Sequence, residues 1–239
     1  MRKNSLKSQA YQTIKNKILS CEFPPGMLLT ENMLCDMFSL GRTPVRDAIS
    51  RLEQEHFVRI FPPKGILVES ITITELNSLF ETRLLFEPYI VLEYGKNVGK
   101  IEFGVFTSYF KNPAILDNPS KFCGIISSFH NIFYEDSANP YLLQFYEQFC
   151  AQEQRMVTLF GITSEQLSPL PPLYHELTRF CANRLWNEAS GCVREIIIIY
   201  RDIMFDAALH HFSLLKQPHK ANDKRTGSPA STEVTNGKK

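Results

Sequence analysis

Long hydrophobic runs are missing from this 239-residue sequence. A membrane-spanning helix needs about 20 mostly apolar residues, and the longest apolar cluster here, IIIIY at residues 196–200, is far shorter. The first residues, MRKNSLKSQ, also lack the apolar core of a secretory signal. We therefore expect a cytoplasmic protein that does not contact a membrane.

Cysteine patterns typical of metal or disulfide sites are also absent. No CxxC pair occurs among the cysteines at 21, 35, 123, 150, 181 and 192, so neither a zinc knuckle nor a disulfide framework is indicated. Several of these cysteines fall where a helix would turn inward, which predicts small buried apolar side chains. The sequence has neither a nucleophile motif nor a glycine-rich phosphate loop, and this argues against an enzyme.

Charge is nearly balanced overall, at a net +1, but it is uneven along the chain. Residues 1–70 carry ten Lys/Arg against seven Asp/Glu (net +3), and residues 71–215 carry ten against sixteen (net −6). Residues 216–239 carry six against two (net +4), are mostly polar and lack aromatic residues. These differences predict a basic domain at 1–70 that suits a polyanion, an acidic domain at 71–215 and a disordered tail at 216–239.

The basic domain has the element order of a winged helix-turn-helix. Apolar residues at helical spacing predict a helix over about residues 6–20, and Thr30 is a good N-cap for a second helix. Two β-prone runs, 57–61 and 66–68, surround PPKG and predict a hairpin. The residues expected on the inner face of the second helix are Met33, Leu34, Met37 and Phe38.

A third helix is predicted within LGRTPVRDAISRLEQEHF, residues 40–57. Thr43 is the expected N-cap, because Pro44 suits the first helical position. The predicted buried stripe, at i, i+3, i+4 and i+7, consists of Val45, Ala48, Ile49 and Leu52.

The opposite edge of this third helix carries Arg42, Arg46 and Ser50. A helix N-terminus suits a phosphate, and arginine can pair with O6 and N7 of guanine in the major groove. The helix alone leaves a second interpretation open, in which this edge is merely a solvated face with scattered charges.

Residues 74–214 predict helices only. The apolar spacing and the intervening prolines predict a long helix from about Thr74 to Tyr94 and further helical segments at about 101–111, 120–137, 140–160, 165–185 and 187–214. No alternating strand pattern occurs in this half, so we expect an all-α bundle and a mostly α protein.

The basic domain resembles the GntR family of bacterial transcription regulators over about residues 8–70. GRTPVRDAISRLEQEHF resembles the family's recognition helix, FPPGMLLTENMLCDMF its second helix and PPKGILV its wing. Gly41 stands where serine or threonine is usual, and His56 replaces a usual glycine, which predicts a differently strained exit from the helix. The DNA-contacting positions that the resemblance implies are Asn32, Arg42, Thr43, Arg46 and, at the wing tip, Lys64 and Gly65.

The acidic domain resembles the FCD effector domain of the FadR subgroup. The stretches that carry this resemblance are FETRLLFEPYIVLEY, FHNIFYEDSANPYLLQF and LYHELTRFCANRLWNEASGCVREI. It implies an antiparallel bundle of six or seven helices around a pocket for a small organic acid. Many such domains bind a metal through an aspartate and three histidines.

Only half of that metal set is present in this chain. His130 and His175 match two of the histidines, but Ile126 and Ile197 stand at the other two positions. A zinc-like ion needs at least three protein ligands, so we expect neither a metal nor another cofactor. The two isoleucines also predict a more apolar pocket.

The roles of the remaining pocket residues stay open at this point. His130 and His175 are expected either to bind an effector or to be satisfied core histidines. Arg83 matches a pocket-facing arginine that would bind an effector carboxylate, or it forms an intrahelical pair with Glu87.

The function we expect is a metabolite-responsive transcription regulator, a repressor by resemblance. It would bind a palindromic double-stranded DNA operator as a homodimer, with a small organic acid or a more apolar effector in the helical domain. The alternatives are a constitutive regulator with a vestigial pocket and an enzyme that uses His130 and His175.

Overall fold

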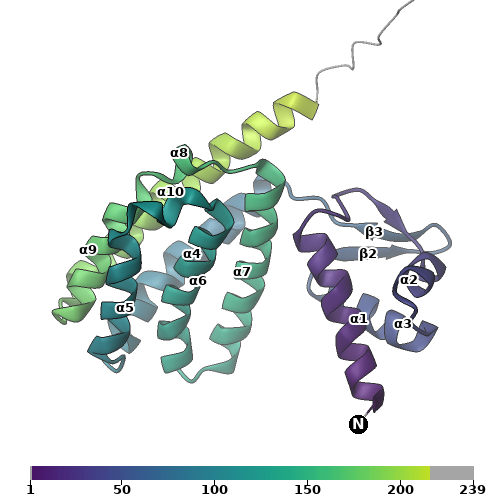
Figure 1. The fold of residues 1–239 in the computed structure, drawn as a ribbon, viewed down its shortest axis with the longest axis horizontal. Helices are drawn as coiled ribbons and strands as arrows, with labels where there is room; N and C mark the ends of the chain where they lie inside the picture. The colour runs from purple at the N-terminus through teal and green to yellow at the C-terminus, as the bar shows by residue number, and fades with distance from the viewer. Residues whose placement is uncertain (1, 216–239) are drawn as a thin grey trace, which may run out of the picture.

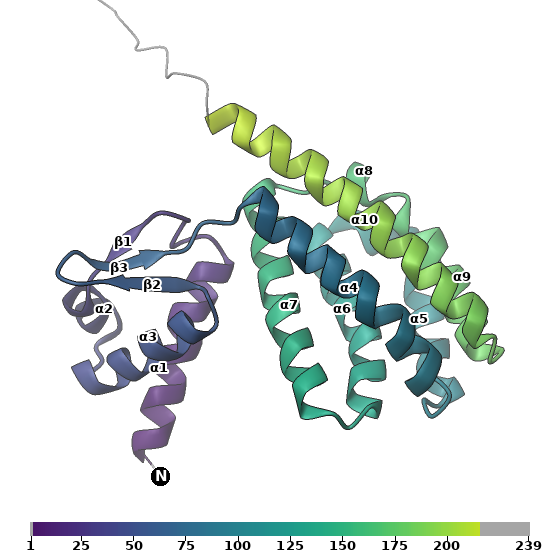
Figure 2. The same cartoon turned by 180° about the vertical axis from the view of Figure 1, so that it is seen from behind.

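The computed structural model describes residues 2–215, and the predicted tail at 216–239 lies outside them. These residues form an N-terminal domain with a small sheet and a C-terminal helical domain (Figures 1 and 2). The fold is mostly α, as predicted. None of its helices is both long and apolar enough to cross a membrane within these described residues.

The N-terminal domain has the predicted order of three helices and a hairpin. Its elements are α1 (Arg2–Leu19), β1 (Leu28–Leu29), α2 (Glu31–Phe38), α3 (Arg42–Gln54), β2 (Val58–Phe61) and β3 (Gly65–Val68). The strands form an antiparallel sheet in the order β1-β3-β2, in which Ile66 pairs with both Leu29 and Ile60. We did not predict β1, because two residues are too few to show an alternating pattern.

The stripe of apolar residues on α3 is buried as predicted. Val45, Ala48, Ile49 and Leu52 are each at most 3% exposed, and they share one core with Ile14 and Ile18 of α1. The prediction for α2 was partly wrong, since Met37 is 47% exposed. The inner face of α2 is centred on Leu34 and Phe38, and Met37 lies about 80° around the helix from that centre.

The start of α3 also differs from the prediction. Gly41 is the N-cap, without a side-chain hydrogen bond, and Arg42 is the first helical residue, so Thr43 does not cap the helix and Pro44 is third. Ser39 ends α2 in the left-handed conformation (φ 51°), and the turn is short enough for the chain to re-enter a helix at Arg42. The backbone N–H groups of Arg42 and Thr43 therefore have no intrahelical carbonyl to bind.

The exit from α3 is strained, as we predicted from His56. This residue has a φ of 60°, in the region that favours glycine.

The C-terminal domain is built of helices throughout the described residues. They are α4 (Ile73–Tyr94), α5 (Lys100–Lys111), the 3₁₀ helix η1 (Pro113–Asp117), α6 (Pro119–Asp136), α7 (Pro140–Phe160), α8 (Ser164–Leu167), α9 (Leu170–Ala182) and α10 (Trp186–Leu215). The single helix predicted over 165–185 was wrong. The helix is interrupted at Ser168 and Pro169, and a new helix, α9, begins at Leu170. Pro171 and Pro172 lie in its first turn, where backbone N–H groups have no intrahelical partner, so the missing proline N–H costs no helical hydrogen bond.

Aromatic rings fill much of the helical core. The rings of Phe110 and Tyr174 stack with centroids 5.0 Å apart, and Phe106 meets Phe129 edge-on at 5.1 Å. Ile126 and Ile197 are at most 1% exposed and belong to the same apolar cluster. The long helices α4 and α10 lie side by side on the face shown in Figure 2.

The two domains meet where the end of α1 lies beside α7 (Figures 1 and 2). Ala151 of α7 packs into the N-terminal core. The guanidinium of Arg155, also on α7, donates to the carbonyl oxygen of Glu69 between the domains, and the Cys21 thiol lies 3.9 Å from the Arg155 carbonyl oxygen. The bundle is therefore packed against the N-terminal domain as well as tethered to it.

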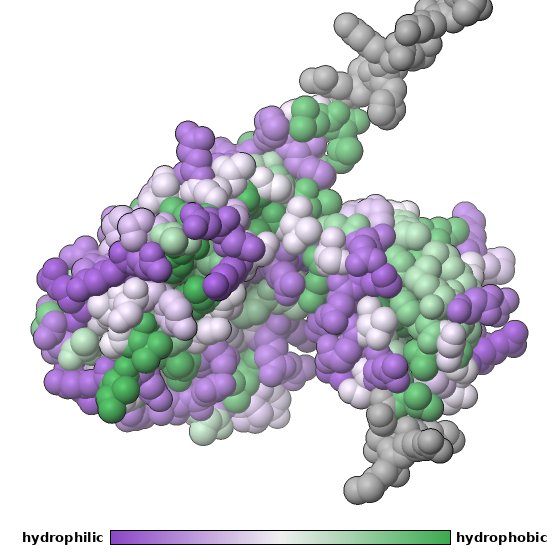
Figure 3. All heavy atoms as spheres, viewed as in Figure 1, coloured by the Kyte–Doolittle hydropathy of each residue, from purple (hydrophilic) through white to green (hydrophobic). Residues whose placement is uncertain are grey.

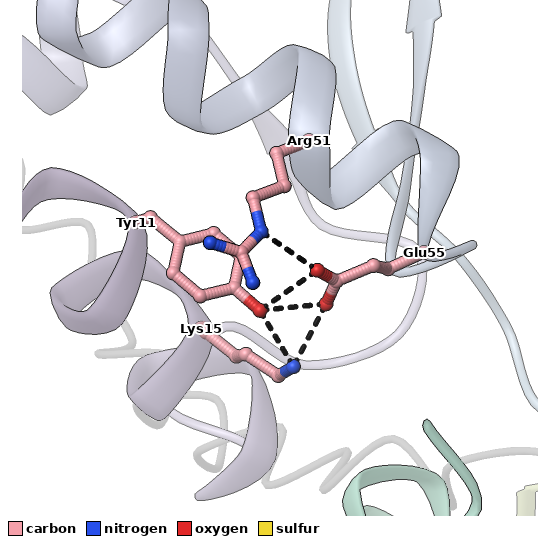
Figure 4. Close-up of polar contacts among 4 residues, drawn as sticks. All are labelled: Tyr11, Lys15, Arg51 and Glu55. Carbon is pink, nitrogen blue, oxygen red and sulfur yellow. Dashed lines mark hydrogen bonds and ion pairs between the residues drawn. The ribbon is translucent and has the colours of Figure 1, made fainter. Parts of the chain in front are cut away.

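A polar cluster joins α1 to the end of α3, and we call it the Glu55 cluster: Tyr11, Lys15, Arg51 and Glu55 (Figure 4). The Tyr11 hydroxyl donates to the Glu55 carboxylate at 2.7 Å, and Lys15 Nζ lies 2.7 Å from both. The Arg51 guanidinium lies over the Tyr11 ring, 3.7 Å from its centroid, and donates to Glu55 at 3.0 Å. Partial burial acts to raise the pKa of Glu55, but the hydrogen bonds from Lys15 and Tyr11 leave that pKa below its ordinary value.

We expect Glu55→Ala to destabilise the N-terminal domain by about 1–3 kcal/mol, because Lys15 and Tyr11 lose their shared acceptor. Hydrogen exchange of the α1 and α3 amides measures this change within the intact chain. Asp47→Ala is the matched control on α3, since the Lys7–Asp47 pair is 44% exposed at both side chains and should contribute about 0.5 kcal/mol or less. Equal effects of the two substitutions would contradict this interpretation.

Candidate nucleic-acid interface and buried polar network

The residues expected to contact DNA lie at the start of α2 and of α3. Asn32, Arg42, Thr43 and Arg46 are all exposed. Arg42 Nη2 lies 3.4 Å from Asn32 Oδ1, so α2 and α3 bring these two side chains together. The exposed arginines lie beside the unpaired N–H groups that begin α3, and this combination favours an anion.

Arg46 is paired within the protein. Its Nε donates to the two carboxylate oxygens of Glu31 at 2.8 and 2.9 Å, although the Arg46 side chain is 63% exposed. Sequence reasoning missed Glu31, because the two residues are 15 positions apart and no local spacing connects them. The pair orients the Arg46 guanidinium at the protein surface.

The wing is the turn between β2 and β3. Both views show it projecting at the same end of the domain as α2 (Figures 1 and 2). Lys64 is exposed in this turn. Gly65 has a structural reason to be glycine, since its φ is 123° and a Cβ there would lie 2.5 Å from the Leu29 carbonyl oxygen.

A buried polar network occupies the interior of the helical domain. It consists of Arg83 and Glu87 on α4, His130 on α6 and Tyr174 on α9, each at most 1% exposed. Arg83 donates to Glu87 through two nitrogens, at 2.5 and 2.9 Å, and its guanidinium lies 4.5 Å from the Phe149 ring centroid. Of the two alternatives open for Arg83, the structure therefore contains the pair with Glu87.

His130 connects Glu87 to Tyr174. Its Nδ1 lies 3.3 Å from Glu87 Oε2, and its Nε2 lies 3.0 Å from the Tyr174 hydroxyl. Burial lowers the pKa of His130 to about 4, outweighing the nearby Glu87 carboxylate. A neutral imidazole fits both contacts if Nδ1–H donates to Glu87 and Nε2 accepts from Tyr174.

His175 lies next to Tyr174 on α9 but outside this network, because its side chain is partly exposed. We did not single out Tyr174. A signal for it was available, since Leu170, Tyr174, Leu177 and Cys181 recur at i, i+4, i+7 and i+11 and are all buried. That spacing places Tyr174 on the inner face of α9 and His175 about 100° away from it.

No group of three or more His, Cys, Asp or Glu side chains is arranged to hold a metal ion in residues 2–215. Ile126 and Ile197 lie in the apolar core instead. All six cysteines are free thiols; Cys123, Cys181 and Cys192 are buried as predicted, whereas Cys21, Cys35 and Cys150 are only partly so.

The buried His130 should make the helical domain sensitive to acid. Its folded pKa is depressed to about 4, whereas an unfolded histidine titrates near about 6.5. As the pH falls, the unfolded state therefore binds a proton at this histidine before the folded state does. The contribution of neutral His130 to the free energy of unfolding is at its full value above about pH 6.5 and is lost as the pH falls toward about 4.

We expect the protonation of this histidine to lower the free energy of unfolding by about 2 kcal/mol between about pH 7 and pH 5. Urea unfolding of the wild-type chain and of His130→Gln across this range measures the loss, which should shrink in the variant. His175→Gln is the control and should leave it unchanged. An identical pH profile for His130→Gln and the wild type would exclude His130 as the source.

Comparison with known proteins finds relatives of the N-terminal domain. Residues 6–68 match the family model described as bacterial regulatory proteins, gntR family. An uncharacterized HTH-type transcriptional regulator from the TAR-I ttuE-ttuC' intergenic region of Agrobacterium vitis is 34% identical over 80 residues, which cover 34% of this chain and 47% of that protein. HTH-type transcriptional repressor GlaR of Escherichia coli (strain K12) is 33% identical over 81 residues, which cover 34% of this chain and 37% of GlaR.

The chain thus spans less than half the length of these curated relatives. A solved structure, E. coli McbR/YncC, matches 85% of this chain and 98% of its own with a TM-score of 0.71 and 18% identity. This likeness extends the shared fold to the helical domain. The family that matches residues 6–68 consists of bacterial regulatory proteins. Residues 6–68 are thus similar to the helix-turn-helix domain of the gntR family.

Proposed function

We propose that the protein is a transcription repressor that binds a palindromic DNA operator as a homodimer and responds to a small-molecule effector in its helical domain. A protein with this role works in the cytoplasm. The observation that carries the DNA-binding part is the start of α3, where exposed Arg42 and Arg46 flank backbone N–H groups without intrahelical partners. The name of the relative GlaR supports the sign of regulation, since it is a repressor.

The proposed DNA contacts are of two kinds: contacts to phosphates, which position the protein, and contacts to base edges, which recognise the sequence. Arg42, Thr43 and the α3 N-terminus would bind phosphate, because free N–H groups and a positive helix end favour anions. Arg46 would read a guanine, whose O6 and N7 present two acceptors as the Glu31 carboxylate does. Asn32 would support Arg42, and Lys64 with Gly65 would bring the wing to the minor groove.

Exposed apolar side chains support the proposed homodimer. On α4, Leu85 is 75%, Phe86 41% and Tyr89 54% exposed. Phe86 lies 5.9 Å from the ring of Phe145 on α7, and Tyr141 of α7 is 82% exposed. We call Leu85, Phe86, Tyr89 and Tyr141 the α4–α7 patch, and we propose that it forms the contact between two copies.

Contacts in the helical domain support two versions of the proposed regulator, one that binds an effector and one that is constitutive. In the first version Arg83, His130 and His175 contact an effector, as the resemblance to the FCD subgroup implies. Arg83 Nη1 supports this version, because it is a buried donor without a hydrogen-bond partner among the described residues. The second candidate is a constitutive regulator. The Arg83–Glu87 pair and the contacts of His130 favour it, because these groups are already paired within the protein.

Arg46→Ala should weaken operator binding by about 1–3 kcal/mol and relax the preference at one base pair, because the bidentate guanine contact is lost. Operator fragments can be selected from random DNA by the wild-type chain, and affinities then measured at one fixed salt concentration. Arg201→Ala removes the same charge from α10, where Arg201 pairs with Asp202, and should leave affinity unchanged. Unaltered affinity and base preference in Arg46→Ala would mean that this edge of α3 is only solvated.

Leu85→Glu combined with Tyr89→Glu should convert the dimer to a monomer, since two charges would be buried without partners in a symmetric contact. Sedimentation velocity measures the oligomeric state. Ile101→Glu is the control, because Ile101 is 85% exposed on α5, a separate surface where apolar side chains are also visible (Figure 3). A dimer that persists in the double variant but dissociates in Ile101→Glu would move the interface to α5.

A further inference from the structure

Most of the wing lies outside the core of the N-terminal domain. Val58, at the start of β2, is buried, but every residue from Arg59 to Lys64 is exposed. Arg59 pairs with Glu69, although its side chain is 60% exposed, and exposed ion pairs contribute little. A surface hairpin with so few core contacts opens readily unless other bonds hold it. The position of the wing therefore depends on its backbone hydrogen bonds.

The register of the sheet leaves the N–H of Ile60 on an outer edge. In the order β1-β3-β2, the strand β2 has β3 as its one neighbour. Successive residues of an antiparallel strand direct their N–H and C=O groups alternately to its two sides. Val68 of β3 bonds through both groups to Met27 and Gly26, on the β1 side. Ile66, two positions earlier, faces the same way. Because Ile60 lies opposite Ile66, its N–H points away from β3.

Glu53 of α3 accepts a hydrogen bond from this edge N–H. The distance from the Ile60 nitrogen to Glu53 Oε1 is 2.9 Å, and α3 lies against β2 (Figure 2). An N–H group on a sheet edge would otherwise bond to water, whereas a carboxylate makes a charge-assisted bond. The bond joins the end of the recognition helix to the strand that leads to the wing tip.

The same helix carries the proposed DNA contacts at its other end. Arg42 is the first residue of α3 and Glu53 the last but one, so they lie roughly 16 Å apart along the helix axis. The backbone hydrogen bonds between them keep this length of helix stiff. A wing that is fixed to Glu53 is therefore also fixed relative to Arg42 and Arg46.

We propose that Glu53 is a positioning residue for DNA binding, which holds the wing at one place relative to α3. Lys64 and the start of α3 would then reach the DNA together. This inference rests on the proposed function and assigns no DNA contact to Glu53 itself. A wing that is already in place loses less conformational entropy on binding. The acceptor oxygen performs this role and the charge does not, because a negative charge on a DNA-binding domain opposes binding.

Hydrogen exchange at the Ile60 amide tests the bond without DNA. Glu53→Ala removes the acceptor, and we expect exchange at Ile60 to accelerate by at least about fivefold. Glu53→Gln keeps an acceptor oxygen and should stay within about twofold of the wild type. Asp47→Ala is the control, since it removes the same charge from an exposed pair on α3 and should leave Ile60 unchanged. The amide of the buried Ile49 is the internal reference that reveals any general loss of stability.

A double-mutant cycle with Lys64→Ala tests the effect on DNA binding. Operator fragments are selected by the wild-type chain, and affinities are measured at one fixed salt concentration. Lys64→Ala should weaken binding by about three- to tenfold in the wild type, in Glu53→Gln and in Asp47→Ala. In Glu53→Ala it should weaken binding by less than about twofold, because the wing is no longer held in place. A residue that only stabilised the domain would leave the effect of Lys64→Ala unchanged.

The two measurements allow this proposal and the proposed function to fail separately. A wild-type chain that selects no operator contradicts the proposed function, while exchange at Ile60 still decides whether Glu53 holds the wing. A smaller effect of Lys64→Ala in Glu53→Ala alone supports the positioning role. An equal effect of Lys64→Ala in every background overturns that role even where the operator is bound. Equal exchange at Ile60 in Glu53→Ala and Glu53→Gln also overturns it.

Discussion

The arrangement of the two domains depends on the contact between Arg155 and the backbone of Glu69. Arg155 is 1% exposed, and burial lowers its pKa. Its charge is therefore held in an unfavourable environment and is satisfied in part by a carbonyl oxygen of the connecting segment. Because Arg155 is rigidly part of α7, a shift of this helix would reach the connection directly and not through a flexible chain.

Local patterns in the sequence were sufficient to predict most of the helices and strands of the fold. The α3 stripe from Val45 to Leu52 has a clear helical period, and the PPKG turn separates two runs that pair as β2 and β3. The wrong predictions concern elements whose presence or first residue depends on tertiary contacts. β1 exists because β3 offers an edge to Leu28 and Leu29, and the start of α3 depends on the turn at Ser39 as much as on Thr43 and Pro44.

The residues of the candidate sites also differ in how well the sequence predicts them. Exposed residues such as Arg42 and Arg46 were accessible to sequence reasoning, because position on one helix defines their surface. The burial of Glu153 was not, since AQEQR in α7 has the polar composition of a solvated stretch, although Ala151, Gln152, Glu153 and Arg155 are all buried. This happens because α7 packs against both α6 and α1, and a single sequence window contains neither neighbour.

The pairing of Arg46 with Glu31 has a consequence for selectivity on the proposed DNA-binding face. Glu31 acts as an internal competitor, because any nucleic acid must replace the hydrogen bond that Arg46 Nε shares between the two Glu31 oxygens. A guanine edge offers two acceptors in return, but other bases do not match that geometry, and the released carboxylate repels nearby phosphates. Arg46 also arrives already neutralised, so its transfer to DNA adds little to the ion release that drives non-specific binding. Glu31 would thus suppress attachment to the wrong sequences more than attachment to the right one.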